Sequence, residues 1–250
     1  MEGRAALTEV ASLLVNYFGP HLQGLYLFGS LASGSFQSGK SDIDLMAVLD
    51  SEVDEERLNA LESLHASFVS KHPDWRERVE VGYVSRAVLQ SLAGTPTGRI
   101  AVISPGEPLN IKDVGYEWVL DWHDVCSSGE ILVGPPPYDL APPVMPENVR
   151  RATEALLQQW TTAVRDPWVA YVPAHQGYIV VTVCRALHTL ATGERVSKED
   201  AVTWAVGQYP EWASFIEEAL AVYRADLSEP HDATIRFVDY AATKAQTQSA

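Results

Sequence analysis

Six prolines lie close together in one short run of the chain, between Gly134 and Pro146. They stand at positions 135, 136, 137, 142, 143 and 146. Proline lacks a backbone N–H and fixes its own φ angle, so such a run can continue neither a helix interior nor a central strand. We therefore expect the run to separate two domains, residues 1–140 and residues 141–250.

The two sides of this run differ in their hydrophobic pattern. Before it, the pattern predicts a helix that ends at Gly19-Pro20, strands at 24–28, 43–49 and 79–83, helices at about 53–70 and 113–125, and a short apolar run at 131–133. After it, apolar residues at helical spacing predict helices at about 147–164, 176–190, 198–208, 211–223 and 232–246. The predicted fold class is α+β, with an N-terminal α/β domain built on a small mixed sheet and a C-terminal all-helical bundle domain.

Composition excludes several classes of protein. The 250 residues include 33 acidic and 18 basic side chains, which give a formal net charge of −15, so a general nucleic-acid binder is not expected. No apolar stretch approaches the roughly 20 residues that span a bilayer, and the first residues lack the order of a secretory signal. We expect a cytoplasmic monomer that has no membrane or nucleic-acid partner. The acidic charge agrees with a small cationic substrate.

Cysteine and histidine usage argues against a metal-sulfur or zinc site. Cys126 and Cys184 are the two cysteines, too few and too far apart in the chain for a disulfide framework or a zinc cluster. The seven histidines contain no close metal-ligand pair, which disfavours a zinc hydrolase. We expect both cysteines to be ordinary thiols, with Cys184 buried.

Three acidic residues, Asp42, Asp44 and Glu80, carry the strongest chemical signal. Side chains two apart in a strand share one face, so Asp42 and Asp44 project together while Ile43 turns into the core. Neighbouring carboxylates raise each other's proton affinity unless a cation lies between them. Mg²⁺ held by carboxylates and substrate phosphates is the expected ion. Glu80, on the next predicted strand, completes a three-acid cluster if the two strands are neighbours.

A second signal precedes the acids. Gly29 and Ser30 directly follow the first predicted strand, and they offer backbone N–H groups and one hydroxyl to a phosphate. Each signal alone is weak, because Gly-Ser is a common turn, Asp-x-Asp is often a solvated turn, and Glu80 between two valines suits the outward face of a half-exposed strand. Their conjunction in this order favours a site for a metal ion and a phosphate.

These residues resemble the signature of the nucleotidyltransferase superfamily with a polymerase-beta-like fold, which is Gly-Ser, about a dozen residues, Asp-x-Asp and a later strand carboxylate. The helical half is similar to the C-terminal domain of the aminoglycoside (3'')(9) adenylyltransferases at residues 181–185, 192–193, 197–198, 201–205 and 219–223. The resemblance covers most of the chain. It implies transfer of AMP from Mg-ATP to a hydroxyl of streptomycin or spectinomycin, an antibiotic-resistance activity.

The resemblance also implies roles for single residues. It implies magnesium ligation by Asp42 and Asp44, a general base in Glu80 that completes the metal cluster, and ATP contacts from Gly29, Ser30, Arg185, Lys198 and Tyr223. Lys198 lies in the first turn of a predicted helix capped by Ser197, where a cation opposes the helix dipole unless an anion is bound nearby. A solvated lysine is the alternative. Arg185 lies in an apolar helix and needs an anionic partner if buried, either a ligand or an acid of its own domain.

The segment of residues 166–176 departs from the family. Before the helix of Arg185, the family supplies a tryptophan and acidic residues that hold the antibiotic, whereas this segment has one acid, Asp166, and His175-Gln176 where an acid is expected. The departure favours, to some extent, the same chemistry on a non-antibiotic hydroxyl. An inactive nucleotide-binding module is a third hypothesis, although such a module need not keep all three acids. Trp118 and Trp122, at helical spacing, are more typical of a core than of a substrate surface.

Overall fold

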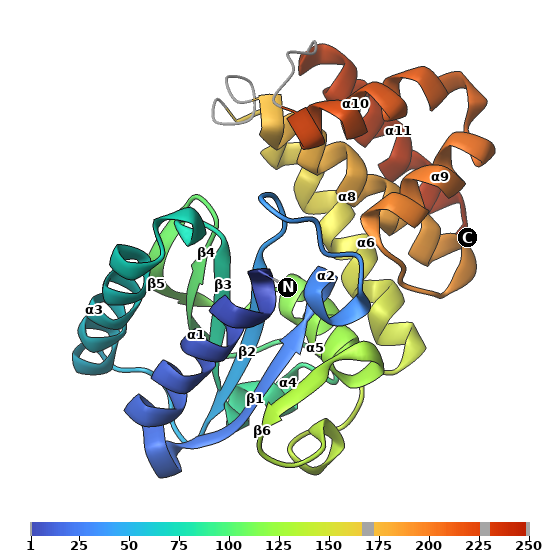
Figure 1. Cartoon of the computed structure of the whole chain (residues 1–250). Helices are drawn as coiled ribbons and strands as arrows, with labels where there is room; N and C mark the ends of the chain where they lie inside the picture. The colour runs from blue at the N-terminus through green and yellow to red at the C-terminus, as the bar shows by residue number, and fades with distance from the viewer. Residues whose placement is uncertain (1, 167–172, 226–230, 249–250) are drawn as a thin grey trace. The chain divides into compact units, whose positions relative to one another are not determined.

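The computed structural model describes residues 2–166, 173–225 and 231–248, and the chain divides between Met145 and Pro146 into two compact units (Figure 1). The division falls five residues after the boundary expected at residue 140. Most of the proline run therefore belongs to the first unit, where the Trp122 indole donates a hydrogen bond to the carbonyl of Pro142 at 2.9 Å.

The first unit is built on a mixed sheet. Its strands are β1 (Leu22–Phe28), β2 (Ile43–Leu49), β3 (Val79–Ser85), β4 (Arg99–Ser104), β5 (Glu107–Asp113) and β6 (Glu130–Val133). They lie in the order β5-β4-β3-β2-β1-β6. Only the β2–β3 pair is parallel among these ladders. A parallel pair needs a crossover connection, and α3 (Glu55–Lys71) supplies it.

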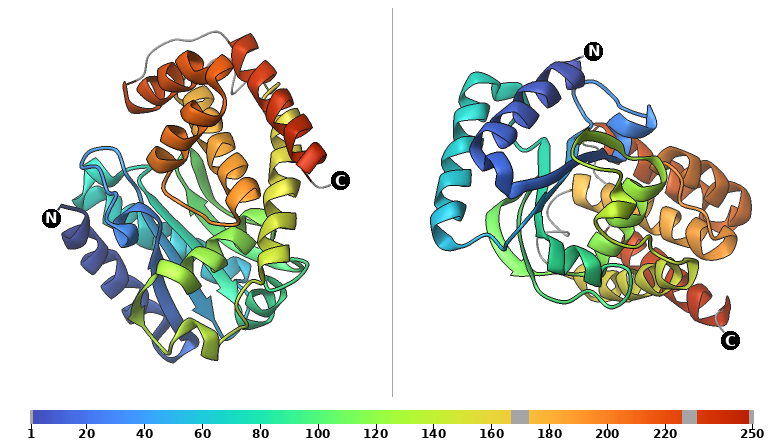
Figure 2. Two further views of the ribbon diagram at one scale, coloured as in Figure 1. Left: turned by 90° about the vertical axis from the view of Figure 1, so that its right-hand side faces the viewer. Right: turned by 90° about the horizontal axis from the view of Figure 1, so that it is seen from below.

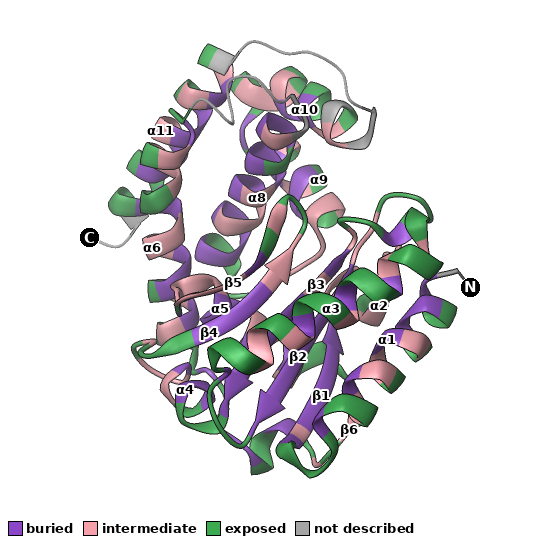
Figure 3. Cartoon of the chain, turned by 90° about the vertical axis from the view of Figure 1, so that its left-hand side faces the viewer, coloured by how far each residue is buried: buried purple, intermediate pink, exposed green. Residues whose placement is uncertain are grey.

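Helices cover both faces of this sheet. On one face, α1 (Glu2–Phe18) and α3 pack on the apolar residues of the central strands, and Ile43, Leu45 and Val81 are fully buried there (Figures 2 and 3). On the other face lies α5 (Tyr116–Ser128), whose Trp122 ring meets the ring of Tyr26 at a centroid distance of 6.2 Å. Two short helices, α2 (Gly29–Ser33) and α4 (Arg86–Ser91), directly follow β1 and β3.

The structure corrects two sequence expectations in this unit. Strands β4 and β5 form a hairpin around Pro105-Gly106 that the sequence pattern did not predict. The helix expected at 113–125 begins instead at Tyr116, because Asp113 is the last residue of β5. Most residues of β5 are half-buried or exposed, so this edge strand lacks the apolar run that identifies the central strands.

All the regular secondary structure described in the second unit is helical. Its helices are α6 (Pro146–Ala163), α8 (Pro173–Thr192), α9 (Lys198–Gln208), α10 (Ala213–Ala225) and α11 (His231–Gln248). Their apolar faces meet in one core around Ile179, Val183 and Phe237, which are fully buried. No described helix is both long and apolar enough to cross a membrane.

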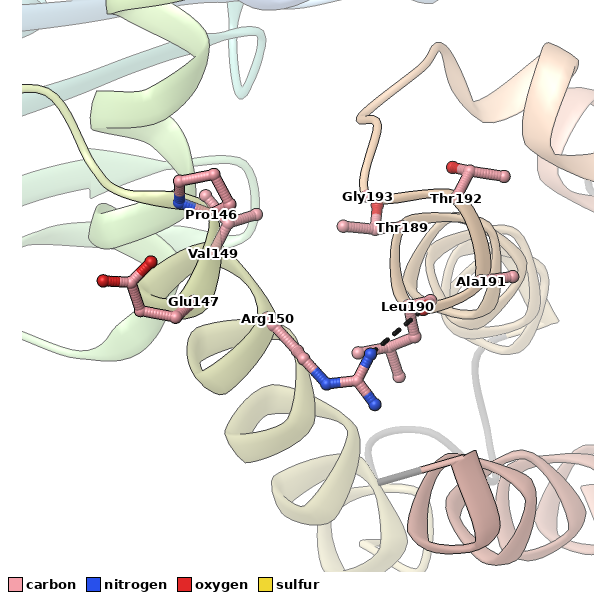
Figure 4. Close-up of a pocket in the computed structure, with 9 residues that line it drawn as sticks. All are labelled: Pro146, Glu147, Val149, Arg150, Thr189, Leu190, Ala191, Thr192 and Gly193. Atoms are coloured by element: carbon pink, nitrogen blue, oxygen red, sulfur yellow. Dashed lines mark hydrogen bonds between the residues drawn. The ribbon is translucent and has the colours of Figure 1, made fainter. Parts of the chain in front are cut away.

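The start of α6 lies beside the end of α8 (Figure 4). Arg150 of α6 donates from Nη1 to the carbonyl of Leu190 at 3.2 Å, and its Nε lies 3.0 Å from the carboxylate of Glu154. A cation at the last carbonyls of a helix is favourable, because those groups carry the negative end of the helix dipole. A pocket of about 400 Å³ between the two helix ends is lined by 146–147, 149–150 and 189–193, and none of the residues predicted for catalysis or ATP binding lines it.

Candidate active site

The register of β2 and β3 brings two of the predicted acids together. Asp44 and Glu80 are direct partners in the parallel ladder. Neighbouring strands lie about 4.8 Å apart, so the two side chains leave adjacent backbones on the same face. Asp42 lies two residues before Asp44, at the end of the loop that enters β2. All three acids are half-buried.

The acids share a face with α5 rather than with α1 and α3. Ile43 and Leu45 are buried in the cluster beneath α1 and α3, so Asp44 between them points to the opposite face. Gly82 follows Glu80 on that face, and a Cβ at Gly82 would lie 2.2 Å from the Trp118 ring. The Trp118 ring therefore packs directly on the strand backbone next to the acids. Trp118 and Trp122 are both buried, which confirms a core role for the pair.

Gly29 connects the predicted phosphate-binding turn to the acids. It directly follows Phe28, the ladder partner of Asp44, and begins α2 with a φ of +68°. A Cβ at Gly29 would lie 2.1 Å from Oδ2 of Asp44. Both the left-handed backbone and this contact require glycine. Gly29 and the half-buried Ser30 therefore lie at the same corner of the sheet as the acid pair.

The acids suit magnesium by their chemistry, since carboxylate oxygens are the ligands that hard divalent cations prefer. The tight fit of Gly29 against Asp44 places a backbone turn beside that donor set. As the side chains stand, residues 2–166, 173–225 and 231–248 contain no group of three His, Cys, Asp or Glu placed to hold one metal ion. Magnesium binding by Asp42, Asp44 and Glu80 therefore stays a prediction.

In the second unit, Lys198 and Tyr223 lie together. Lys198 Nζ donates to Tyr223 Oη at 3.2 Å, and it lies 4.6 Å from the ring centroid of Tyr178 and 5.1 Å from that of Tyr223. Lys198 begins α9, and its N-cap Ser197 accepts a hydrogen bond from the Asp200 N–H. The predicted cap is confirmed. An ammonium group that contacts two aromatic rings and a hydroxyl is held in one place, unlike that of a solvated lysine.

One face of α8 extends this group. Tyr178, Thr182 and Arg185 follow one another at steps of four and three residues, so they share a face. The Thr182 hydroxyl is buried, without a hydrogen-bond partner among the described residues. Arg185 is half-buried. Sequence reasoning singled out Arg185 but missed Tyr178, although its position two turns before Arg185 was a usable signal.

Helix packing fixes Tyr223. A Cβ at Gly177 of α8 would lie 2.7 Å from the backbone nitrogen of Tyr223 and 2.8 Å from the carbonyl oxygen of Ala219. Glycine thus lets α8 and α10 approach until their backbones touch. Gln176 beside it is buried, and its Oε1 accepts a hydrogen bond from Thr234 at 3.3 Å. Of the departing segment 166–176, residues 167–172 lie outside the described part of the chain.

The cysteines take no part in this site. Burial raises the pKa of both Cys126 and Cys184 to about 12. Neither thiol therefore ionises near neutral pH to become a nucleophile. The expectation that Cys184 is buried is confirmed.

Comparisons with known proteins identify two domains in the chain. Residues 12–92 match the family model of the nucleotidyltransferase domain, and residues 139–246 match that of the C-terminal domain of aminoglycoside adenylyltransferase. The structure is similar to a crystal structure of spectinomycin adenyltransferase AAD(9) from Enterococcus faecialis with ATP and spectinomycin. That match has a TM-score of 0.78 at 16% identity and covers 97% of this chain and 99% of that chain, which shows a shared fold. A toxin-antitoxin structure with AMP-PNP aligns at a TM-score of 0.31 and 16% identity, over 62% of this chain and 90% of that chain.

Two domain models thus match in the order expected from the sequence, and the fold is the one predicted, an α/β nucleotidyltransferase domain before a helical domain. The chain therefore belongs to the aminoglycoside adenylyltransferase family and is an adenylyltransferase.

Proposed function

We propose that this chain transfers AMP from Mg-ATP to a hydroxyl group of an aminoglycoside or aminocyclitol antibiotic, with spectinomycin and streptomycin as the candidate acceptors. The observation that carries the proposal is the ladder pairing of Asp44 with Glu80 beside the left-handed turn at Gly29. It aligns two carboxylates next to backbone that can approach a phosphate closely, in a chain of this family.

The residues of the first unit take distinct roles. Asp42 and Asp44 would hold magnesium, with Glu80 beside them, and the bound ion would neutralise charge on the phosphates of ATP. Gly29 and Ser30 would meet those phosphates through backbone N–H groups and the Ser30 hydroxyl. Glu80 would take the proton of the acceptor hydroxyl.

The proposed reaction replaces one P–O bond with another. The acceptor oxygen attacks the α-phosphorus of ATP and forms a new P–O bond, while the bond from that phosphorus to the bridging oxygen breaks. Pyrophosphate leaves with the electron pair of the broken bond. The hydroxyl proton passes to a carboxylate oxygen of Glu80 and later to solvent.

The second unit would supply positive charge for ATP. Lys198 is held against the rings of Tyr178 and Tyr223, so the position of its ammonium group is fixed before ATP binds. With Arg185 on the neighbouring helix, it would bind the triphosphate, and Tyr223 would contact the nucleotide. Preorganised cations bind an anion with less loss of side-chain entropy than flexible ones.

The candidate acceptors differ in the support that they have. Spectinomycin is supported by the similar fold of an enzyme whose crystal structure contains ATP and spectinomycin. Streptomycin has less support, because the segment of residues 166–176 carries few acids for a cationic drug and its Gln176 is buried against Thr234. A non-antibiotic hydroxyl is the alternative acceptor for the same chemistry.

Mass spectrometry tests the proposal directly. The wild-type chain is incubated with Mg-ATP and each antibiotic, and the antibiotic is examined for added AMP. Asp44→Asn should abolish the addition. Asp50→Asn, the same change in the exposed residue after the other end of β2, should leave it unchanged. Addition to neither antibiotic would contradict the proposed acceptors, and addition by Asp44→Asn at the wild-type rate would contradict the proposed site.

A further inference from the structure

Arg78, directly before β3, contacts the loop between α2 and β2 that ends at Asp42, a role that no sequence pattern indicated. Its Nη2 donates to the carbonyl of Ser41 at 2.7 Å, and Ser41 is the residue before Asp42. Its Nη1 donates to the carbonyl of Asp74 at 3.2 Å. The guanidinium lies 4.5 Å from the ring centroid of Trp75. One side chain therefore ties the turn before β3 to the loop before β2.

The backbone of Arg78 adds a second tie. Its carbonyl accepts the N–H of Ile43 at 3.0 Å, and Ile43 separates Asp42 from Asp44. Glu80, the second residue of β3, follows two residues after Arg78. Arg78 is thus bonded on both sides of Asp42 and lies within two residues of Glu80.

Hydrogen bonds and ring contacts hold the loop between α2 and β2. Within it, the Gln37 N–H donates to Ser41 Oγ at 2.9 Å, and the Ser41 N–H donates to the Gln37 carbonyl at the same distance. Phe36 stacks on Trp75 with ring centroids 6.4 Å apart. Trp75 is itself buried and lies against the guanidinium of Arg78. The Phe36–Trp75–Arg78 stack therefore contacts both ends of the loop.

The local backbone carries a cost at this point. Glu77, directly before Arg78, has a φ of +56°, the one left-handed non-glycine residue among those described. Such a conformation is unfavourable for an L residue, because its Cβ crowds the carbonyl oxygen. The Arg78 Nε is also buried without a hydrogen-bond partner in the described part of the chain. Strained backbone and unsatisfied polar atoms persist where surrounding contacts hold them, and they are frequent near functional sites.

We propose that Arg78 is a positioning residue for Asp42, and that its planar fork fixes the direction from which this carboxylate approaches the metal ion. The inference rests on the proposed function for the identity of the ion. A lysine could keep the charge and the stem over Trp75, but its ammonium group cannot reproduce the fork that reaches two carbonyls in fixed directions. The role therefore requires arginine. Its loss should loosen the loop between α2 and β2 while the core stays folded.

The test compares Arg78→Lys and Arg78→Gln with Arg86→Gln. Arg86 follows the other end of β3, is exposed, and donates to the Asp139 carbonyl at 3.3 Å. Arg86→Gln is thus a matched control, because it also removes a hydrogen bond from a guanidinium to a backbone carbonyl in the first unit. Three quantities are measured for each protein: amide hydrogen exchange of residues 36–43, the Mg²⁺ concentration that gives half the maximal rate of AMP transfer, and the melting temperature.

In both Arg78 variants the amides of residues 36–43 should exchange faster than in wild type. Both variants should also need about 10 to 100 times more Mg²⁺ for half the maximal rate, the usual effect of losing a residue that orients a metal ligand. Arg86→Gln should match wild type in both measurements. Arg78→Lys keeps the positive charge, so it should stay folded and report on the loop even if Arg78→Gln does not fold.

The outcomes separate the two proposals. Wild-type magnesium dependence in folded Arg78→Lys would overturn the positioning role, as would unchanged exchange at residues 36–43. A wild-type chain that transfers no AMP to any hydroxyl and binds no Mg-ATP would instead overturn the proposed function, whatever the exchange of the loop shows.

Discussion

A methyl group at Gly29 should disable the site while leaving the fold largely intact. The Cβ of Gly29→Ala would start 2.1 Å from Asp44 Oδ2 and 2.8 Å from Asp44 Cγ. Ordinary contacts begin at 3.4 Å, so the carboxylate or the turn must move by roughly 1 Å. A displacement of that size at a reacting centre costs about 100-fold in rate.

The stability cost has a separate origin and can be subtracted. An L residue with a φ of +68° lowers the free energy of unfolding by roughly 1–2 kcal/mol. The reduced entropy of the unfolded chain partly offsets this loss. Gly34 has a similar φ of +81° and ends the same short helix, and a Cβ at this residue would meet nothing within 4 Å. Gly34→Ala should therefore lose about as much stability as Gly29→Ala without disturbing Asp44.

Urea unfolding and the rate of AMP transfer are measured for both variants. We expect similar free energies of unfolding, about 1 kcal/mol below wild type, and a transfer rate that falls about 100-fold only in Gly29→Ala. Equal transfer rates in the two variants would refute the argument, because the contact with Asp44 would then have no effect on the reaction.

Three other perturbations probe the proposed base, the packing of α8 on α10, and a buried histidine. Glu80→Gln should keep the thermal stabilisation that Mg-ATP gives and lower AMP transfer by roughly 10²–10⁴-fold, whereas loss of both would make Glu80 chiefly a metal ligand. Gly177→Ala should cost roughly 1–3 kcal/mol and weaken ATP binding, because its Cβ meets the backbone of Tyr223, while Gly207→Ala, with open space around its Cβ, should leave ATP binding unchanged and raise stability by up to about 1 kcal/mol. The buried imidazole of His65, whose Nε2 lies 2.6 Å from Tyr83 Oη, has its pKa lowered by burial from 6.5 to about 4. The unfolded chain therefore binds the proton first, so the stability from neutral His65 is complete above pH 6.5 and is lost as the pH falls toward 4, up to about 3 kcal/mol; a urea-unfolding series without this slope would contradict the assignment.

One strongly apolar strand and one capped helix could be predicted from sequence with accurate bounds. The strand at 43–49 and the helix at 198–208 have the predicted limits. Every residue of β2 except Asp44 is buried, so its apolar composition is typical of a central strand. Ser197 marks the start of α9 because it caps that helix. The edge strand β5 gave no signal because it buries few of its side chains, whereas the buried run Ile100-Ala101-Val102 of β4 was a usable signal that was missed.

The site could be predicted in its residue types but not in its arrangement. Nothing in the spacing of Asp44 and Glu80 states that their strands are parallel neighbours with these two residues as partners, since that register comes from long-range packing. The contact between Gly29 and Asp44 depends on the same register. Arg78 gave no signal, because an arginine before a strand is ordinary until its partners are known.

The pairing of β2 with β3 also determines where a chain with this fold can tolerate insertions and deletions during evolution. Slipping β3 by one residue would turn Glu80 toward the face beneath α1 and α3 and would bring Val79 and Val81 out of their buried positions. Slipped chains would lose their core, so natural selection for folding alone removes them. The short loop of residues 50–54 that joins β2 to α3 is not bound by this register, because loop closure depends only weakly on length. Insertions and deletions should therefore accumulate in that loop rather than in α3, whose Leu61 and Phe68 are buried, while the alignment of the acids is inherited together with the core.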